Sequence, residues 1–316
     1  MDLGLNLAHL HLLLNHFPTV GTIGATGLFV LALLKKSDDL KRASLAALFT
    51  LAIVALPAYM TGYSAQAAIK GRPDISTAMI DSHQVAALVG LIVLEITGAV
   101  AWFGLWQYRR HARPRAWVMP ATLVLSLLSV ALMARAANIG GGVVHEEARA
   151  AREFTPPAFE PDMLKSAAVT QMLTDYPWVW PVAEILHFLG LAVLFGVVLA
   201  VNLRLLGVMK HVALVDVYKL LPLAMWAFVI QGVTGMVFFI GQAFQYIDNV
   251  AFHWKILLML LAAANVLYLT IFDDFWELGP EDDAPMLAKV ASASQVALWV
   301  GVLFFGRMLP YLGNAF

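Results

Sequence analysis

Long apolar runs alternate with short polar loops along the whole chain. Each run has roughly 20 residues, which is enough for an α-helix to cross the hydrocarbon core of a bilayer. All runs are expected to be helices, because lipid offers no hydrogen-bonding partner to an open backbone. The pattern therefore predicts an all-α polytopic membrane protein. Eight spans are expected, at about residues 17–34, 43–62, 84–107, 117–138, 181–203, 220–243, 254–272 and 290–309.

The composition supports a membrane protein and narrows its chemistry. The chain is 61% hydrophobic and 13% charged, whereas soluble domains are about 25% charged. The net charge of −1 gives no reason to expect a nucleic-acid partner. Cysteine is absent, which excludes disulfides, thiolate metal sites, cysteine-ligated iron–sulfur clusters and covalent c-type haem. A redox cofactor would therefore have to be held by histidine.

The basic residues predict an orientation. Most lysines and arginines lie in the loops 35–42, 107–115 and 204–219, which the positive-inside rule assigns to the cytoplasm. Both termini would then face the periplasm, with the chain in a bacterial inner membrane. The N-terminus lacks a basic region and a cleavage site, so no signal peptide is expected. Residues 1–15 are expected to be an interfacial or frayed extension of the first span.

The two halves of the chain carry the same residue types in the same order. Each half contains a histidine followed by phenylalanine, then Thr-Gly, a second histidine, a buried polar residue and an arginine. This order indicates a parallel duplication of a four-helix bundle. We expect domains at 1–138 and 181–316, joined by a periplasmic linker at 139–180. The matched pairs are His16 and His187, Thr61 and Thr234, His83 and His253, Glu95 and Asn265, and Arg135 and Arg307.

The repeated histidines suggest haem. Histidines on the first and third helices of a bundle can face each other across its core, and a haem iron takes two axial imidazoles. Arginine at the end of the fourth helix suits the propionates. The expected cofactor-binding residues are His16, His83 and Arg135 in the first half and His187, His253 and Arg307 in the second.

Structural explanations stand beside these assignments. His16 can be an interfacial residue at a helix start, and His83 can cap its helix. Both arginines can be snorkelling anchors.

Three further residues are candidates for accessory roles. Glu184 can hydrogen-bond His187 or point toward water. Glu95 lies deep in a span, where it can join a proton path, line a quinone pocket or pack against another helix. His145, which follows three glycines, can be a further ligand, a cover for the first site or a loop residue. Asn265 suggests a hydrogen bond between helices.

Two resemblances accompany these motifs. The first half, with "HFP", His83 and "GGGVVHEE", resembles over about residues 8–150 a mainly uncharacterised bacterial family of four-helix membrane domains in which haem binding is suspected. The second half, with "LHFLGLAVLFGVVLAVNLRLLG" and a final "GR", is similar over about 181–312 to another uncharacterised family. Both look like relatives of four-helix b-type cytochromes. The second resemblance implies a histidine at His187 more firmly than at His253.

These expectations lead to a functional hypothesis. The chain is expected to be a b-type membrane cytochrome with one or two haems, passing electrons between a periplasmic redox partner and the quinone pool. It would be an anchor subunit of an oxidoreductase complex rather than a stand-alone enzyme. Alternatives are a proton-linked transporter and a histidine-based periplasmic metal-handling protein. Aromatic residues that can line a quinone site, or form an interfacial belt, are Trp178, Trp180, Phe244 and Tyr246.

Overall fold

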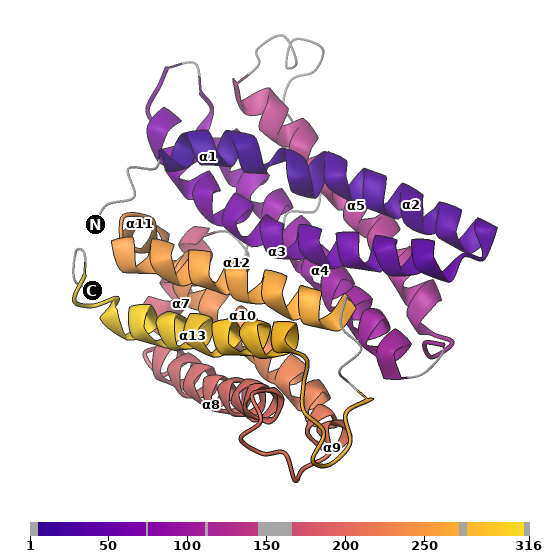
Figure 1. Cartoon of the computed structure of the whole chain (residues 1–316). Helices are drawn as coiled ribbons and strands as arrows, with labels where there is room; N and C mark the ends of the chain where they lie inside the picture. The colour runs from indigo at the N-terminus through magenta and orange to yellow at the C-terminus, as the bar shows by residue number, and fades with distance from the viewer. Residues whose placement is uncertain (1–5, 74, 111–112, 145–165, 272–276, 313–316) are drawn as a thin grey trace. The chain divides into compact units, whose positions relative to one another are not determined.

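The computed structural model describes residues 6–73, 75–110, 113–144, 166–271 and 277–312. Every regular element in these ranges is a helix (Figure 1). Eight helical segments are long and apolar enough to cross a membrane. This confirms the expected number of spans and the all-helical membrane class.

The chain divides into two compact units, Met1–Ala168 and Val169–Phe316. The range expected to be a linker, 139–180, is partly helical in the described residues. The helix α5 continues to Val144, and a separate helix α7 covers Ser166–Asp175. His145 lies outside the described residues.

The first unit is a closed four-helix bundle. Its first span consists of α1, a π-helical turn and α2, which follow one another along one side of α3. α3 packs on α4 and α4 on α5, while α2 contacts both α3 and α5. The elements are α1 (Leu7–Leu14), the π-helical turn (Phe17–Gly21), α2 (Thr22–Lys35), α3 (Asp38–Ile69), α4 (Thr77–Arg110) and α5 (Val118–Val144).

Small residues allow the helices of this bundle to pack closely. A Cβ added at Gly98 of α4 would collide with Ala52 of α3, so glycine is needed at that crossing. The hydroxyls of Thr97 on α4 and Ser129 on α5 are 2.9 Å apart and hydrogen-bonded. Interfaces of this kind are typical of membrane helices, where small and hydroxyl side chains replace the hydrophobic effect as the source of association.

The first span begins earlier than the apolar pattern predicted. Its helix starts at Leu7, so the described part of the expected N-terminal extension belongs to the span. Pro18 does not start a helix but lies within the π-helical turn, where the wider turn tolerates a residue that has no amide hydrogen. Thr22 donates a hydrogen bond to the carbonyl of Pro18 at 2.6 Å. The consequence is that His11 lies within the membrane-spanning helix.

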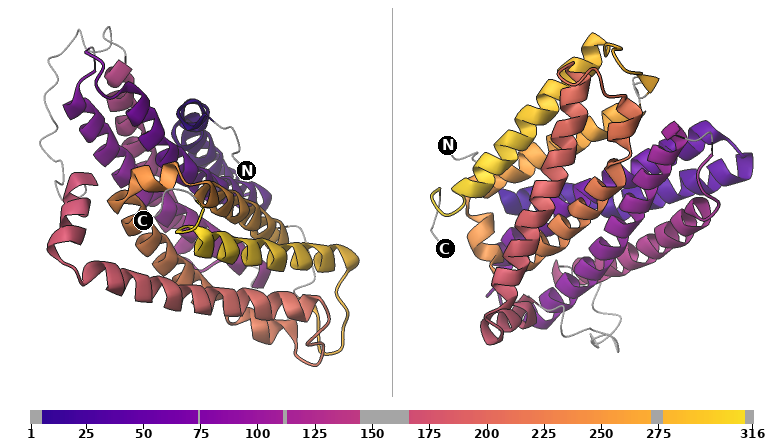
Figure 2. Two further views of the ribbon diagram at one scale, coloured as in Figure 1. Left: turned by 90° about the vertical axis from the view of Figure 1, so that its left-hand side faces the viewer. Right: turned by 90° about the horizontal axis from the view of Figure 1, so that it is seen from below.

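The second unit has the same order of long helices but a looser closure. α8 contacts α10 and α13, and α12 packs on α13 (Figure 2). α10 and α12 are connected through α11 and approach each other less closely than α3 and α4 do, although the rings of Phe239 and Phe252 stack between them at 5.6 Å. The elements are α8 (Val179–Leu205), α9 (Leu214–Tyr218), α10 (Leu221–Gly241), α11 (Ala243–Ile247), α12 (Val250–Ile271) and α13 (Met286–Met308).

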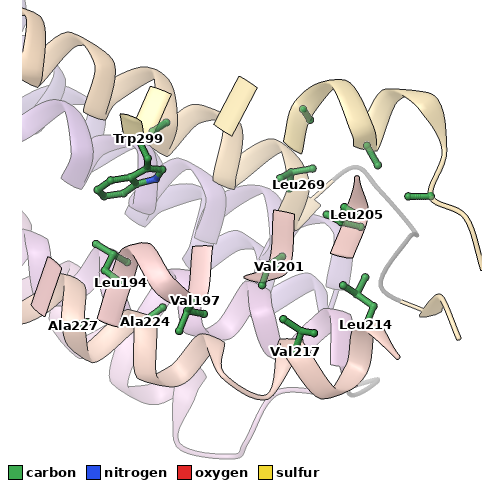
Figure 3. Packing of buried hydrophobic residues seen from close by; sticks show 14 of the residues in the cluster. Leu194, Val197, Val201, Leu205, Leu214, Val217, Ala224, Ala227, Leu269 and Trp299 are labelled. Atoms are coloured by element: carbon green, nitrogen blue, oxygen red, sulfur yellow. The ribbon is translucent and has the colours of Figure 1, made fainter. Parts of the chain in front are cut away.

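A large apolar cluster joins the long helices of the second unit. It gathers Leu194, Val197 and Val201 of α8 with side chains of the other helices (Figure 3). Trp299 of α13 is 8% exposed and closes one end of this cluster. At the other end of α8, Arg204 is fully buried and donates to the carbonyls of Val212, Gly279 and Asp282.

Candidate functional site

The imidazole of His11 is fixed against α3. Its Nδ1 lies 2.8 Å from the carbonyl oxygen of Ala58. A carbonyl only accepts hydrogen bonds, so Nδ1 carries a proton, and in the neutral imidazole Nε2 therefore keeps its lone pair. The ring lies over Gly62, where an added Cβ would be 3.3 Å from Cε1. Glycine at this position therefore lets the imidazole lie close to the backbone of α3.

His83 is held in the same way by the next pair of helices. Its Nδ1 lies 3.0 Å from the carbonyl oxygen of Ala136 on α5, which again leaves the lone pair on Nε2. A Cβ at Gly140 would be 2.7 Å from Cε1 of His83, closer than real contacts allow. His11 and His83 are near enough for a charge on one to affect the other. The first bundle thus brings together two anchored, neutral imidazoles.

His16 does not take part in this arrangement. Its side chain is exposed, and its Nδ1 is 3.1 Å from the carbonyl of Leu12 in its own helix. Positions 11 and 16 are five residues apart, so they lie on different faces of the first helix. The expected partner of His83 was His16, but the structure places His11 there.

His187 repeats the anchoring in the second unit. Its Nδ1 is 2.8 Å from Oγ1 of Thr234 on α10. Thr234 donates its own hydroxyl proton to the carbonyl of Ile230 at 2.7 Å. Its oxygen therefore accepts from Nδ1, and Nε2 of His187 keeps the lone pair. Gly235 lies under the ring, as Gly62 does in the first unit, with an added Cβ 3.5 Å from Cε1.

His253 has a different role from the one expected. Its Nε2 is 2.7 Å from the carbonyl oxygen of Ile247, in the turn before α12. The proton is therefore on Nε2, the nitrogen that is free in His11, His83 and His187. This bond closes the connection from α11 to α12. The structure does not bring His253 and His187 together as a matched pair.

The residue that corresponds to His83 is Lys255. Its side chain lies against Gly306 of α13, with Nζ 3.8 Å from an added Cβ, as His83 lies against Gly140 of α5. Lys255 is also within electrostatic range of His187. No hydrogen bond or ion pair to its ammonium occurs in the described part of the chain. The repeated glycine opposite the third helix is the signal that could have identified it.

The remaining candidates lie apart from these contacts. Arg135 is half-buried on α5 and has no hydrogen-bond or ion-pair partner among the described residues. Arg307 is exposed, and its guanidinium lies 5.9 Å from the ring centre of Tyr311. Glu184 is exposed on α8. Oε1 of Glu95 is buried without a hydrogen bond in the described structure.

The amide of Asn265 donates to the carbonyl of Ala291 at 2.8 Å, and this confirms the expected hydrogen bond between helices.

Aromatic rings flank His187. The ring centre of Phe238 is 5.6 Å from that of His187, and Trp180 packs against Phe238 at 4.8 Å. Trp178 and Phe244 are exposed.

Tyr246 is buried beside Phe252 at a ring distance of 5.0 Å. Burial raises the pKa of Tyr246 to about 12, so its hydroxyl stays protonated at neutral pH. Of the four aromatic candidates, only Trp180 joins the surroundings of His187 through the contacts described.

Comparison of the chain with known protein families, curated proteins and solved structures finds no match. Within the described ranges, no group of three or more histidine, cysteine, aspartate or glutamate residues is placed to hold a metal ion. What the first unit offers is a pair of neutral imidazoles. A pair of this kind suits the two axial positions of a haem iron.

Proposed function

We propose that the first unit binds one b-type haem between His11 and His83, and that the chain is an electron-transferring membrane cytochrome subunit. The observation that supports this most is the anchoring of both imidazoles by Nδ1, with the lone pair of Nε2 left for iron. Metal-binding histidines almost always donate a hydrogen bond from their other ring nitrogen to a carboxylate, a backbone carbonyl or water, which fixes both tautomer and orientation.

The rest of the first unit fits such a group. Neutral imidazoles bring no charge into the apolar bundle, and Gly62 and Gly140 leave room for rings at the helix surfaces. Arg135 is half-buried on α5, near Gly140 in sequence, and can donate paired hydrogen bonds to a carboxylate such as a propionate. When bound, the haem supplies reversible one-electron chemistry; the protein holds and orients it.

We also propose the side of the membrane and the partners. The distribution of lysine and arginine puts both termini in the periplasm. His11 and His83 lie near the first residues of α1 and α4, so they would be close to that face. The electron partner would then be a periplasmic redox protein, with the quinone pool on the membrane side. The matching contacts of His11 and His187 support a duplicated four-helix unit.

Haem stoichiometry and the reduced-minus-oxidised spectrum of the purified protein test this proposal. We expect one b-type haem per chain, lost in both His11→Ala and His83→Ala. His16→Ala is the matched control, because His16 is on the same helix but exposed, and it should keep the haem. A colourless protein after haem-replete expression would exclude the proposal, and so would haem lost from His16→Ala but retained in His11→Ala.

A proton-linked carrier is the second candidate, and Glu95 is the observation that favours it. Its Oε1 is buried in a membrane span and has no hydrogen bond in the described structure. Ionisable residues at such depth often belong to proton pathways. Proteoliposomes containing wild-type protein and Glu95→Gln would decide: a carrier would show substrate-driven proton movement that the variant abolishes, whereas a cytochrome subunit would show none.

A further inference from the structure

All four long helices of the second unit contribute to one end of its bundle. His187 lies near the start of α8 and Lys255 near the start of α12. The antiparallel partners bring Gly235, near the end of α10, against His187, and Gly306, near the end of α13, against Lys255. The fold therefore places an imidazole and an ammonium at the same end of the bundle, each facing a glycine, and within electrostatic range of each other.

This pair differs in chemistry from the histidine pair of the first unit. Nε2 of His187 has a lone pair that accepts a proton or a hydrogen bond, because Nδ1 is bonded to Thr234. A protonated lysine has three donors and no lone pair, so it is no match for the second imidazole of a haem. The end of the second bundle thus presents one acceptor, Nε2 of His187, and one donor, Nζ of Lys255.

Lys255 is the stronger indication of a ligand. Its aliphatic stem packs on Gly306, and the described residues provide no partner for its ammonium. A cation inside a membrane span is costly, and such residues are usually retained because they bind or transport something. An oxygen acceptor delivered by a ligand would supply the missing hydrogen bond.

We propose that His187 and Lys255 bind the oxygen-bearing headgroup of a lipid-soluble quinone, an inference that rests on the proposed function. The quinol hydroxyl donates to Nε2 of His187, and the carbonyl of the oxidised form accepts from Nζ of Lys255. Phe238 and Trp180, whose rings lie beside His187, supply apolar surface for the headgroup ring.

The arrangement of helices supports a lipophilic ligand. α10 carries Thr234 and Gly235, and α12 carries Lys255. The rings of Phe239 on α10 and Phe252 on α12 stack at 5.6 Å and join these two helices, which otherwise approach each other less closely than α3 and α4 do. A headgroup ring and its isoprenoid tail would enter beside this aromatic stack rather than through a tight helix pair.

The test is calorimetric titration of decylubiquinone into the purified full-length protein in detergent. Wild-type protein is expected to bind one equivalent saturably. Lys255→Met should weaken the binding of decylubiquinone about tenfold or more, because it removes the donor to the quinone carbonyl. His187→Ala should weaken by a similar factor the binding of the reduced form, decylubiquinol, titrated in the same way, because it removes the acceptor of the quinol hydroxyl. The matched controls His253→Gln and Lys289→Met should bind within about twofold of wild type, since these side chains bond to Ile247 and Asp283 instead.

Melting curves and haem stoichiometry, measured on the same samples, distinguish the ways in which this test can fail. Melting curves should show Lys255→Met to be at least as stable as wild type, since it removes an unpaired cation. Unaltered binding of decylubiquinone to Lys255→Met and of decylubiquinol to His187→Ala would overturn the quinone site while leaving a haem in the first unit untouched. No binding to the wild-type protein would overturn it in the same way. Two haems per chain, with one lost in His187→Ala, would also overturn it. Quinone binding in a haem-free protein would overturn the cytochrome proposal alone.

Discussion

A single hydrogen bond decides what a histidine in an apolar helix can do. In His11, His83 and His187 the bond is made by Nδ1 to a neighbouring helix, and Nε2 is left with its lone pair. In His253 it is made by Nε2, and the ring closes a turn. Four residues of one type therefore have two different chemistries, set by the acceptor each finds.

Gly140 offers a direct test of the imidazole contacts in the first unit. Gly140→Ala places a Cβ 2.7 Å from Cε1 of His83, which forces the ring or the helix to move. We expect a loss of haem affinity of about tenfold or more, measured as haem retained after dialysis against apomyoglobin. Gly141→Ala is the control, because nothing lies within 4 Å of its added Cβ. Equal haem retention in both variants would contradict the contact.

The residue scale is also where the sequence was least informative. His83 and His187 were identified because polar residues are rare in apolar runs. His11 was missed because His16, in the "HFP" motif, was the more conspicuous histidine, and the face that each occupies depends on the path of the helix. Lys255 was missed because His253, two residues before it, was taken as the match of His83.

At the scale of elements, Arg204 fixes the end of α8 to the chain before α13. It is fully buried and donates to the carbonyls of Val212, Gly279 and Asp282. Among the described residues, backbone carbonyls are the hydrogen-bond partners of this cation. The loop that leads into α13 therefore depends on one side chain from a distant part of the sequence.

Replacing Arg204 by methionine should destabilise the second unit. The change leaves buried carbonyls without donors, so we expect a loss of about 3 kcal/mol or more in unfolding free energy. Thermal or SDS unfolding of the purified protein measures it. Lys219→Met is the control, since Lys219 and Asp216 form an exposed pair that contributes less than about 1 kcal/mol. A similar loss in both variants would show that Arg204 is not a tie between elements.

Asp283 makes a weaker, pH-dependent connection at the same end. Hydrogen bonds from Lys289 and Lys210 lower the pKa of its carboxyl group, with Nζ of Lys289 at 2.7 Å and Nζ of Lys210 at 3.1 Å. The folded pKa lies below the unfolded value of about 3.9, so the contribution is present above that pH and disappears as the pH falls through the folded pKa. When the pH is lowered from 5 to 3, the Asp283→Asn variant should therefore lose less stability than the wild-type protein does.

Melting temperatures of both proteins across that range measure the difference. The variant should already be slightly less stable than wild type at pH 7, and the two curves should converge on the acid side. Parallel plots of melting temperature against pH would mean that Lys289 and Lys210 do not pair with the carboxylate of Asp283 when the protein is in solution.

The number of membrane-spanning helices could be predicted from the apolar composition of the runs. The residues at which the helices begin and end could not. Eight spans follow from the apolar runs because lipid leaves the backbone no alternative to a helix. The start of the first span was wrong because a proline usually marks the first turn of a helix, whereas Pro18 lies within a wider turn. The looser contact between α10 and α12 had no signal in the sequence, since both helices are as apolar as α3 and α4.

At the scale of the whole molecule, the chain consists of two compact units. Each has its own bundle and its own end where a histidine lies against a glycine. If the units are also independent in stability, changes in one should leave the chemistry of the other unaltered, as holds for distant sites that share no partners.

Expression of residues 1–168 alone tests this independence. We expect the fragment to insert into membranes and to retain a haem with the spectrum of the full-length protein, because His11, His83 and their anchoring carbonyls all lie within it. Absorption spectra of the fragment and of full-length His187→Ala give the comparison. A fragment that folds but does not bind haem would show that the second unit completes the site.

The π-helical turn at Phe17–Gly21 has a consequence for how the first span could change. Such a turn holds one residue more than an α-helical turn, and one residue corresponds to about 100° of rotation around the helix axis. Losing any single residue from this turn would re-phase α1 relative to α2 without altering a side chain in either. His11 would then rotate away from Ala58. The bundle would lose an inward-facing imidazole although His11 itself is unchanged.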